Sequence, residues 1–309
     1  MSLPRLCYIN TKGSNCDQPS RFTTCGIANS KPGLIRWLTL TQMTYFRSGK
    51  SQGFSRSGED QILQKLIAEL LPADHGRSAV DIGAGDGVRW SNTYALFGEG
   101  WRGLGAEGDP AKVIKLARAY RNYPNVFACR ALVTPATVCP LLQAYEIEKN
   151  FSVLSLDIDG NDYWVLRAIL SQFRPRLIVT EINEKIPPPI RFIVKYNPSF
   201  TLRHHFFGFS ISSLADLCQE FDYSLVALEY NNAFLAANEL TGVQPLATET
   251  AYGSGYRDRA ERKKLFAPNN DMEIMHSLSP EEGVLFLQQF YEKFAGEYYL
   301  SLAKIDALS

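Results

Sequence analysis

The segment Val80-Asp81-Ile82-Gly83-Ala84-Gly85-Asp86-Gly87 decides the fold of this 309-residue chain. An apolar run over residues 78–82 carries an acidic residue near its end and leads into a turn with three glycines in five positions. Glycine is needed where a backbone bends sharply or lies against a ligand, because a Cβ would clash there. In open α/β sheets, ligands bind beyond the carboxyl ends of the strands. The segment therefore predicts a binding site for a nucleotide-type cofactor.

Strands and helices are expected to alternate around this segment. A helix over 59–71 comes first, with Ser57 as its N-cap and Pro72 as its end. Strands are expected at 78–82, 102–107, 125–129, 152–157 and 176–182, and helices at 91–98, 110–121, 137–149 and 162–172. This alternation is typical of βαβ units, and it predicts a parallel sheet with helices on both faces.

A helix at 212–221 and two further apolar runs complete the expected sheet. The runs 224–229 and 233–237 are separated by Tyr230-Asn231-Asn232, a spacing that predicts an antiparallel hairpin at the sheet edge. The predicted fold class is therefore α/β: a Rossmann-like, doubly wound, seven-stranded and mostly parallel sheet with an antiparallel closing hairpin.

The remaining segments are expected to flank this sheet. Residues 1–50 lack sustained periodicity and are predicted to form an irregular N-terminal extension. The α/β domain is expected over 51–240, with 184–206 as a structureless loop over the site. Residues 241–309 are expected to form a mostly helical C-terminal extension. Within it, the capping box Ser279-Pro280-Glu281-Glu282 opens a helix to about residue 302, whose aromatic residues predict core packing or a homodimer seam.

Composition excludes several classes of partner. The chain has 32 basic and 32 acidic residues, so no overall charge favours nucleic acid or an anionic membrane. Its apolar runs are shorter than the roughly 18 residues of a membrane span, and polar residues interrupt any signal-peptide core. The six cysteines lack the paired spacing of zinc sites. We therefore expect a cytoplasmic protein with free thiols.

Ordered motifs follow one another between residues 50 and 240. They are Ser57-Gly58-Glu59-Asp60, 81–87, Ser91-Asn92-Thr93, Glu107-Gly108-Asp109, 157–164 and Glu181-Ile182-Asn183. In this order they resemble the motifs of class I S-adenosylmethionine-dependent methyltransferases, and more narrowly those of the FkbM-like family. The resemblance implies S-adenosylmethionine as cofactor and O-methylation of a hydroxyl on a sugar, a glycoside or a polyketide-type natural product.

This cofactor carries no phosphate, so the glycines are expected to let the backbone lie against its methionine and ribose parts. Asp81 is a candidate for holding its ammonium group. Glu107, 22 residues after Gly85, is a candidate for accepting both ribose hydroxyls. Asp86 and Asp109 also suit a turn or a helix cap. The predicted cofactor-binding residues are Asp81, Gly83, Gly85, Asp86, Gly87, Asn92, Thr93, Glu107 and Asp157.

Polar side chains also follow the next two expected strands. Asp157 and Asp159 alternate onto one face of their strand, as do Glu181 and Asn183 on its neighbour. Oxygen ligands gathered at one sheet edge suit Mg²⁺, and the arrangement is similar to that of catechol O-methyltransferase. Asp159, Glu181 and Asn183 are therefore candidate metal ligands that would orient and activate a hydroxylated small-molecule acceptor.

Other interpretations of the same residues stay open. In a metal-free enzyme, His204, His205 or Glu181 serves as general base, so the predicted catalytic set is Asp159, Glu181, His204 and His205. In a simpler interpretation, Asn161 or Asp162 caps the following helix.

Two other functions are also compatible with the predicted fold. An NAD-dependent enzyme shares the ribose acid, and Tyr145 and Lys149 have the spacing of short-chain dehydrogenases, but Val88 stands where the dinucleotide fingerprint has its third glycine. A non-catalytic binding module would keep the fold, but it has no need for clustered carboxylates that repel one another. Binding of S-adenosylhomocysteine or of reduced nicotinamide distinguishes these functions.

Overall fold

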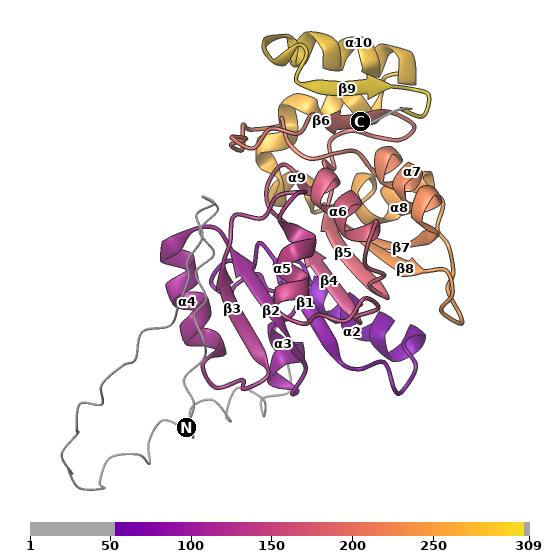
Figure 1. Ribbon diagram of the computed structural model, residues 1–309. Coiled ribbons are helices and arrows are strands. Elements are labelled where there is room, and N and C mark those ends of the chain that lie inside the picture. Colours follow the sequence, from indigo (N-terminus) through magenta and orange to yellow (C-terminus); the bar gives the residue numbers. More distant parts are fainter. Residues whose placement is uncertain (1–52, 306–309) are drawn as a thin grey trace, which may run out of the picture. The chain divides into compact units, whose positions relative to one another are not determined.

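A seven-stranded sheet in the order β3-β2-β1-β4-β5-β8-β7 forms the centre of the computed structural model, which describes residues 53–305 (Figure 1). Its strands are β1 (Ser78–Ile82), β2 (Arg102–Glu107), β3 (Val126–Arg130), β4 (Val153–Leu156), β5 (Leu177–Glu181), β7 (Tyr223–Glu229) and β8 (Asn232–Ala237). Strands β1 to β5 are parallel, and β8 runs antiparallel between β5 and β7. The predicted mostly parallel sheet with an antiparallel closing hairpin is confirmed. The predicted extension 1–50 lies outside the described residues.

Helices connect the strands and cover both faces of the sheet. They are α2 (Glu59–Leu70), α3 (Tyr94–Gly98), α4 (Pro110–Tyr120), α5 (Val138–Ala144), α6 (Asp162–Leu170) and α7 (Ile211–Phe221). The strand order runs outward from β1 to β3 and then returns to β4. Because crossovers are right-handed, this reversal puts α3 and α4 on one face and α5 and α6 on the other (Figure 1).

Local chemistry explains where three helices differ from the expected ranges. Ser57 is not the N-cap of α2; Gly58 occupies that position with a φ of 96° and makes no side-chain cap. Helix α3 begins at Tyr94 because the Ser91 hydroxyl accepts the amide hydrogens of Thr93 and Tyr94. Helix α5 ends at Ala144, and Glu146 has a φ of 54°, which an α-helix cannot continue through.

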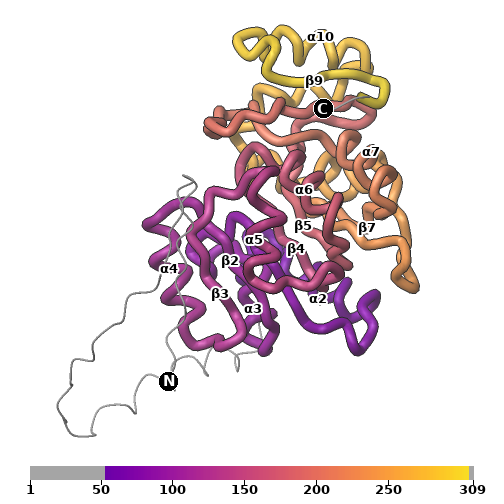
Figure 2. The backbone as a smooth tube through the Cα atoms, viewed as in Figure 1, coloured from indigo at the N-terminus to yellow at the C-terminus, as the bar shows by residue number. Residues whose placement is uncertain are grey.

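The segment 184–206 is not the structureless loop expected from its prolines. Strand β6 (Arg191–Val194) pairs antiparallel with β9 (Tyr298–Ser301), so two segments more than 100 residues apart form a second small sheet. Figure 2 shows these two segments running together next to α10 (Pro280–Phe290). The aromatic and β-branched run of β6 is buried, which favours the strand.

The C-terminal helix is shorter than expected. The predicted capping box of Ser279 and Glu282 is confirmed, but α10 ends at Phe290. A short 3₁₀ turn, Glu292–Phe294, and Gly296 with a φ of 87° then lead into β9. The aromatic residues predicted to lie on one helix face instead gather around Phe192 and Phe206 in a second hydrophobic cluster. Their interpretation as core packing is confirmed, and a homodimer stays a prediction.

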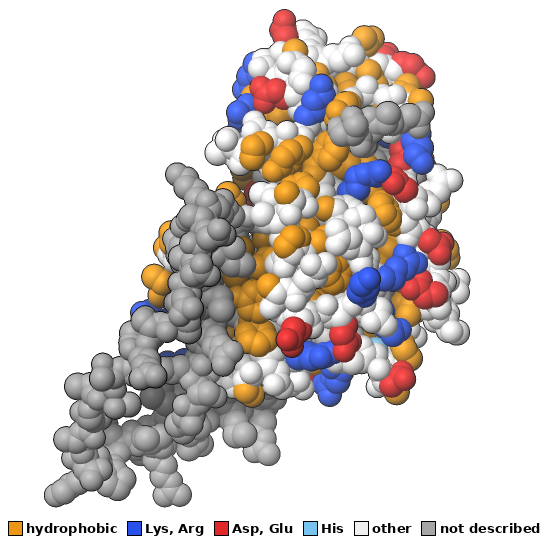
Figure 3. All heavy atoms as spheres, viewed as in Figure 1, with side chains coloured by type: hydrophobic (Ala, Val, Ile, Leu, Met, Phe, Trp, Pro, Cys, Tyr) orange, Lys and Arg blue, Asp and Glu red, His pale blue; other side chains and the backbone are white. Residues whose placement is uncertain are grey.

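Between the hairpin and α10 the chain forms short helices: α8 (Thr248–Tyr252), a π-helical turn (Gly253–Arg257), α9 (Arg262–Leu265) and a 3₁₀ segment (Ala267–His276). On the face drawn in Figure 3, Lys and Arg side chains alternate with Asp and Glu and form no basic patch. Ion pairs such as Arg167–Glu220 and Arg174–Glu239 join opposite charges on the described part of the chain. No helix among residues 53–305 has both the length and the apolar character needed to cross a membrane.

Candidate functional site

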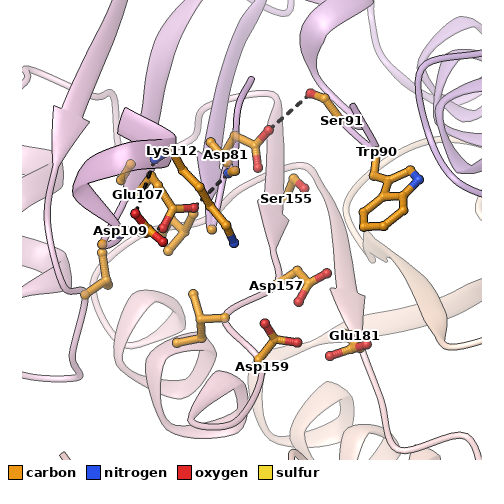
Figure 4. A pocket seen from close by; sticks show the side chains of 18 of the residues that line it. Asp81, Trp90, Ser91, Glu107, Asp109, Lys112, Ser155, Asp157, Asp159 and Glu181 are labelled. Carbon is orange, nitrogen blue, oxygen red and sulfur yellow. Dashed lines mark hydrogen bonds between the residues drawn. The ribbon is translucent and has the colours of Figure 1, made fainter. Parts of the chain in front are cut away.

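A cavity of about 480 Å³ opens at the carboxyl edge of the sheet. Its walls come from the ends of β1, β2, β4 and β5, together with short segments around Trp90, Phe200 and Asn231. The cavity lies beside β1, where the strand order reverses, and ligands bind at such switch points in open α/β sheets. Figure 4 shows the labelled side chains that converge on it.

The three glycines of the turn have different roles. A Cβ on Gly83 would lie 1.6 Å from the carbonyl oxygen of Asp157, so the β1 turn and the end of β4 can approach only at a glycine. A Cβ on Gly87 would lie 2.6 Å from the Leu116 side chain of α4, so this glycine serves packing and is not among the lining residues. Gly85 lines the cavity and has open space around it.

The Glu107 carboxylate is held in place by backbone groups. One oxygen accepts the amide hydrogen of Gly85 at 2.9 Å, and the other accepts that of Asp109 at 2.8 Å. Each oxygen keeps a second lone pair for a ligand. Asp109 also caps α4. Asp86 is a turn residue outside the lining, because its carboxylate accepts the amide hydrogens of Val88 and Arg89.

Asp81 lies buried at the floor of the cavity, and the Ser91-Asn92-Thr93 motif supports it. Its carboxylate accepts a 2.6 Å hydrogen bond from the Thr93 hydroxyl. Burial raises the pKa of Asp81 to about 6, against the effect of that hydrogen bond. Thr93 is fully buried and lies outside the lining, whereas Asn92 lines the cavity and donates to the Ser155 hydroxyl at 3.3 Å.

Three carboxylates meet at the other end of the cavity. Asp157, Asp159 and Glu181 each offer an oxygen within 4.8 Å of the other two, and Figure 4 shows them pointing toward one another. The turn between Asp157 and α6 is shaped by Asp162, which accepts the amide hydrogens of Ile158 and Gly160 at 2.8 Å each. Asp162 therefore organises this turn. The N-cap of α6 is Asn161, whose side chain makes no capping hydrogen bond, so the simpler interpretation of these residues as helix caps is wrong.

Crowding changes the acidity of this triad. The side chain of Asp157 opens onto the cavity but is surrounded by protein; this desolvation, with the charges of Asp162 and Asp159, raises its pKa to about 8. Desolvation and the Asp157 charge raise the pKa of Glu181 well above its ordinary value. Desolvation also raises the pKa of Asp159, although Lys112 opposes the shift. The triad therefore holds protons, or a cation in their place, up to a higher pH than ordinary carboxylates do.

Asn183 and the two histidines lie apart from the triad. The Asn183 amide is buried and donates to the backbone carbonyls of His205 and Phe207. His204 and His205 are not among the lining residues; the His205 ring lies beside Asp271. Burial and the Lys185 ammonium lower the pKa of His205 to about 4. The structure thus brings Asp157 together with Asp159 and Glu181, and Asn183 is not among the residues that line the cavity.

Several lining residues do not follow from the sequence motifs. Asn231 donates to Glu181 at 2.6 Å, and Asn232 donates to Glu59 at 3.1 Å. Both amides were assigned only to the hairpin turn. Because β8 is antiparallel to β5, its first residue necessarily lies beside Glu181, and this rule could have placed them.

Trp90 is a further lining residue that the motifs did not indicate. Its backbone has a φ of 62°, unusual for a bulky residue, and its side chain is 57% exposed, with the Arg89 guanidinium 4.1 Å from the ring centre. The Trp90 amide donates to Phe54, so the segment before α2 fixes this side of the cavity.

No protein-family model matches the chain, and a search of curated proteins gives no match. Similar solved structures include several described as S-adenosylmethionine-dependent methyltransferases. The CurJ carbon methyltransferase is 13% identical over 64% of this chain and 58% of its own, with a TM-score of 0.38. An O-methyltransferase from Bacillus cereus in complex with SAH is 15% identical over 64% of this chain and 88% of its own, with a TM-score of 0.39.

Magnesium protoporphyrin IX methyltransferase from Synechocystis, with bound SAM, is 13% identical over 63% of this chain and 89% of its own, with a TM-score of 0.36. Both O-methyl and carbon methyl transfer are thus represented among these proteins. Similarity at this level concerns the fold, and the activity of this chain has to be argued from its own cavity.

Proposed function

We propose that the cavity binds S-adenosylmethionine and that the chain is an FkbM-like O-methyltransferase of a hydroxylated small molecule. The charge of the cavity carries this proposal. Three cationic side chains line it, Arg56, Arg89 and Lys112. The lining carboxyl groups are more numerous: Glu59, Asp81, Glu107, Asp109, Asp157, Asp159 and Glu181. Even with Asp157 and Glu181 counted as neutral, because their pKa values are raised, the acidic groups outnumber the basic ones. An acidic cleft attracts a sulfonium cation and repels the pyrophosphate of a dinucleotide.

The residues of one end, which we call the cofactor end (Asp81, Gly85 and Glu107), fit the proposed ligand. Glu107 is fixed by two backbone amides and keeps lone pairs for the two ribose hydroxyls. Gly85 leaves open space where the backbone would lie against the ligand. The buried Asp81 carboxylate offers the opposite charge for the ammonium group. Bound there, S-adenosylmethionine would supply an electrophilic methyl group.

The other end, which we call the acceptor end (Asp157, Asp159 and Glu181), suits activation of a hydroxyl group. These carboxylates fit a hard divalent cation such as Mg²⁺, which would lower the pKa of a bound hydroxyl. If no cation binds, the raised pKa of Asp157, about 8, suits a general base. Chelation by EDTA distinguishes the two mechanisms, because only the first loses activity.

The lining beside the acceptor end suits a hydroxylated ring. The exposed Trp90 ring and Phe200 offer flat apolar faces, and Asn161, Asn231 and Asn232 offer amide groups for hydroxyls. We therefore propose a sugar, a glycoside or a polyketide-type natural product as acceptor.

Substitution of Glu107 tests cofactor binding. Glu107→Gln replaces the charged acceptor, so the Kd for S-adenosylhomocysteine should rise about 10- to 100-fold in a calorimetric titration, as expected for lost hydrogen bonds to a charged group. Asp86→Asn is the matched control, since Asp86 belongs to the same turn but faces its own backbone. Equal affinity in the wild type and Glu107→Gln would contradict the proposal.

A further inference from the structure

A second group of potential ligands lies outside the cavity. His204, His205 and Asp271 each offer a ligand atom within 4.8 Å of the other two. The two histidines follow β6, whereas Asp271 belongs to the 3₁₀ segment Ala267–His276. None of the three lines the cavity, and the proposed methyl transfer does not use them.

His205 and Asp271 lie as close together as the partners of an ion pair, but the geometry of their contact is not that of a hydrogen bond. The His205 Nε2 atom lies 2.8 Å from an Asp271 carboxylate oxygen. The His205 side chain is only 3% exposed, yet its Nε2 has no hydrogen bond of acceptable geometry. A buried polar atom without a partner is costly and needs an explanation. Two donor atoms on a tetrahedral zinc ion lie about 3.3 Å apart, with their lone pairs directed at the ion, so a small side-chain movement would convert this contact into a pair of ligands.

The backbone holds the two imidazoles together. His204 has a φ of 49°, and Arg203 and Phe206 are bridged across the turn. The rings of His204 and His205 consequently lie edge to face, 3.7 Å apart between centres. Buried side chains also hold the turn in place. The His205 carbonyl accepts hydrogen bonds from the Asn183 amide at 2.9 Å and from the Tyr291 hydroxyl at 2.7 Å.

From this geometry we infer that His204, His205 and Asp271 form a metal site for a Zn²⁺-type ion. Two imidazoles and one carboxylate are ligands that zinc accepts, whereas Mg²⁺ prefers oxygen. His204 and Asp271 are exposed, so an ion can enter from solvent and water can complete its coordination. The nearby Lys185 ammonium is offset by Glu184, 3.0 Å away.

Such an ion would tie two distant segments together. The loop that carries Phe200, part of the cavity wall, continues within four residues to His204. Asp271, the ligand on the other segment, belongs to the 3₁₀ segment Ala267–His276. Met272 and Met275 of the same segment are buried in the second hydrophobic cluster, which holds the segment in place. Zinc is therefore expected to raise the melting temperature of the protein and to stabilise this wall, independently of cofactor binding.

The experiment is a Zn²⁺ titration of the full chain without a histidine tag, in excess Mg²⁺ to occupy any oxygen-only site. The wild type should bind one Zn²⁺, with a rise in melting temperature. His204→Ala and Asp271→Asn change exposed ligands, so both variants should fold and should bind Zn²⁺ at least about tenfold more weakly.

Asp159→Asn is the matched control, because it removes a carboxylate of the other cluster and should leave the Zn²⁺ affinity unchanged. Circular dichroism checks that each variant is folded. The inference is overturned if the wild type binds no Zn²⁺ under these conditions, if both ligand variants bind it as the wild type does, or if only Asp159→Asn loses it.

Discussion

At the cofactor end of the cavity the carboxylates accept hydrogen bonds from the protein itself, whereas at the acceptor end three carboxylates lie close to one another. Glu107 accepts two backbone amide hydrogens, and Asp81 accepts a 2.6 Å hydrogen bond from Thr93. Asp157, Asp159 and Glu181 instead lie within reach of one another, and the pKa of Asp157 rises to about 8, above the value of about 6 that burial gives Asp81. The first end is organised before any ligand binds. The acceptor end instead favours a bound group that carries positive charge.

The largest expected effect comes from the glycine that holds the two ends together. A Cβ at Gly83 would meet the Asp157 carbonyl at 1.6 Å, with a φ of 86°. Gly83→Ala should destabilise the fold by about 2–5 kcal/mol, the sum of overpacking and left-handed strain. Gly100→Ala is the control, since Gly100 has the same φ of 86° and open space around it. If thermal unfolding shows that both variants lose the same stability, the close approach of Gly83 to the Asp157 carbonyl is disproved.

A cation at the acceptor end should stabilise the protein in the absence of any acceptor. At 100 times its Kd, Mg²⁺ would add about 2.7 kcal/mol to the free energy of unfolding. Differential scanning fluorimetry at pH 8 should show this rise for the wild type and not for Asp159→Asn. The exposed carboxylate of Glu99 provides a control variant, Glu99→Gln, which should respond as the wild type does. If Mg²⁺ raises the melting temperature of all three proteins equally, it does not act through the triad.

The pH dependence of stability should differ between the two ends in the absence of metal. A carboxyl with a raised folded pKa stabilises the fold when protonated. For Asp157 this contribution is complete below pH 3.8 and is lost as the pH rises through about 8. The melting temperature of the metal-free protein should therefore fall between pH 6 and pH 9.

Asp157→Asn sharpens this comparison, because the neutral amide should flatten the decline between pH 6 and pH 9. Excess Mg²⁺ should flatten it as well, since a cation favours the ionised carboxylates. A melting temperature that stays constant or rises over this range in the metal-free wild type would contradict the crowding of the triad.

Local sequence was sufficient for the central sheet. Strands β1 and β2 have the predicted bounds because their residues form buried apolar runs, each ending at a turn that glycine marks. Glu107 and Asp81 line the cavity, as was expected from their positions near the ends of these strands. The triad was predicted in part: Asp159 and Glu181 were expected at one edge of the sheet. Glu181 ends β5 as expected, but β4 ends at Leu156, and Asp159 lies in the turn beyond it with a φ of 58°, so alternation along the strand does not account for its position.

Non-local pairing explains what the sequence did not predict. The run Tyr298–Ser301 continues the helical spacing of aromatic residues, but it forms a strand because Arg191–Val194 pairs with it. The same pairing sets the path of the loop after β5. It carries His204 and His205 away from the cavity, and it directs the Asn183 amide onto backbone carbonyls. The contribution of Asn231 depends on β8, and not β7, lying beside β5. The predicted hairpin left this order open, and once the order is known the antiparallel pairing places Asn231 beside Glu181.

The most direct test of the central claim, an acidic cavity built for S-adenosylmethionine, is a pair of calorimetric titrations of the wild-type chain. One uses S-adenosylhomocysteine and the other uses reduced nicotinamide adenine dinucleotide. We predict one site of micromolar affinity for S-adenosylhomocysteine and no binding of the dinucleotide. Binding of the dinucleotide alone, or of neither ligand to a folded protein, would contradict the account.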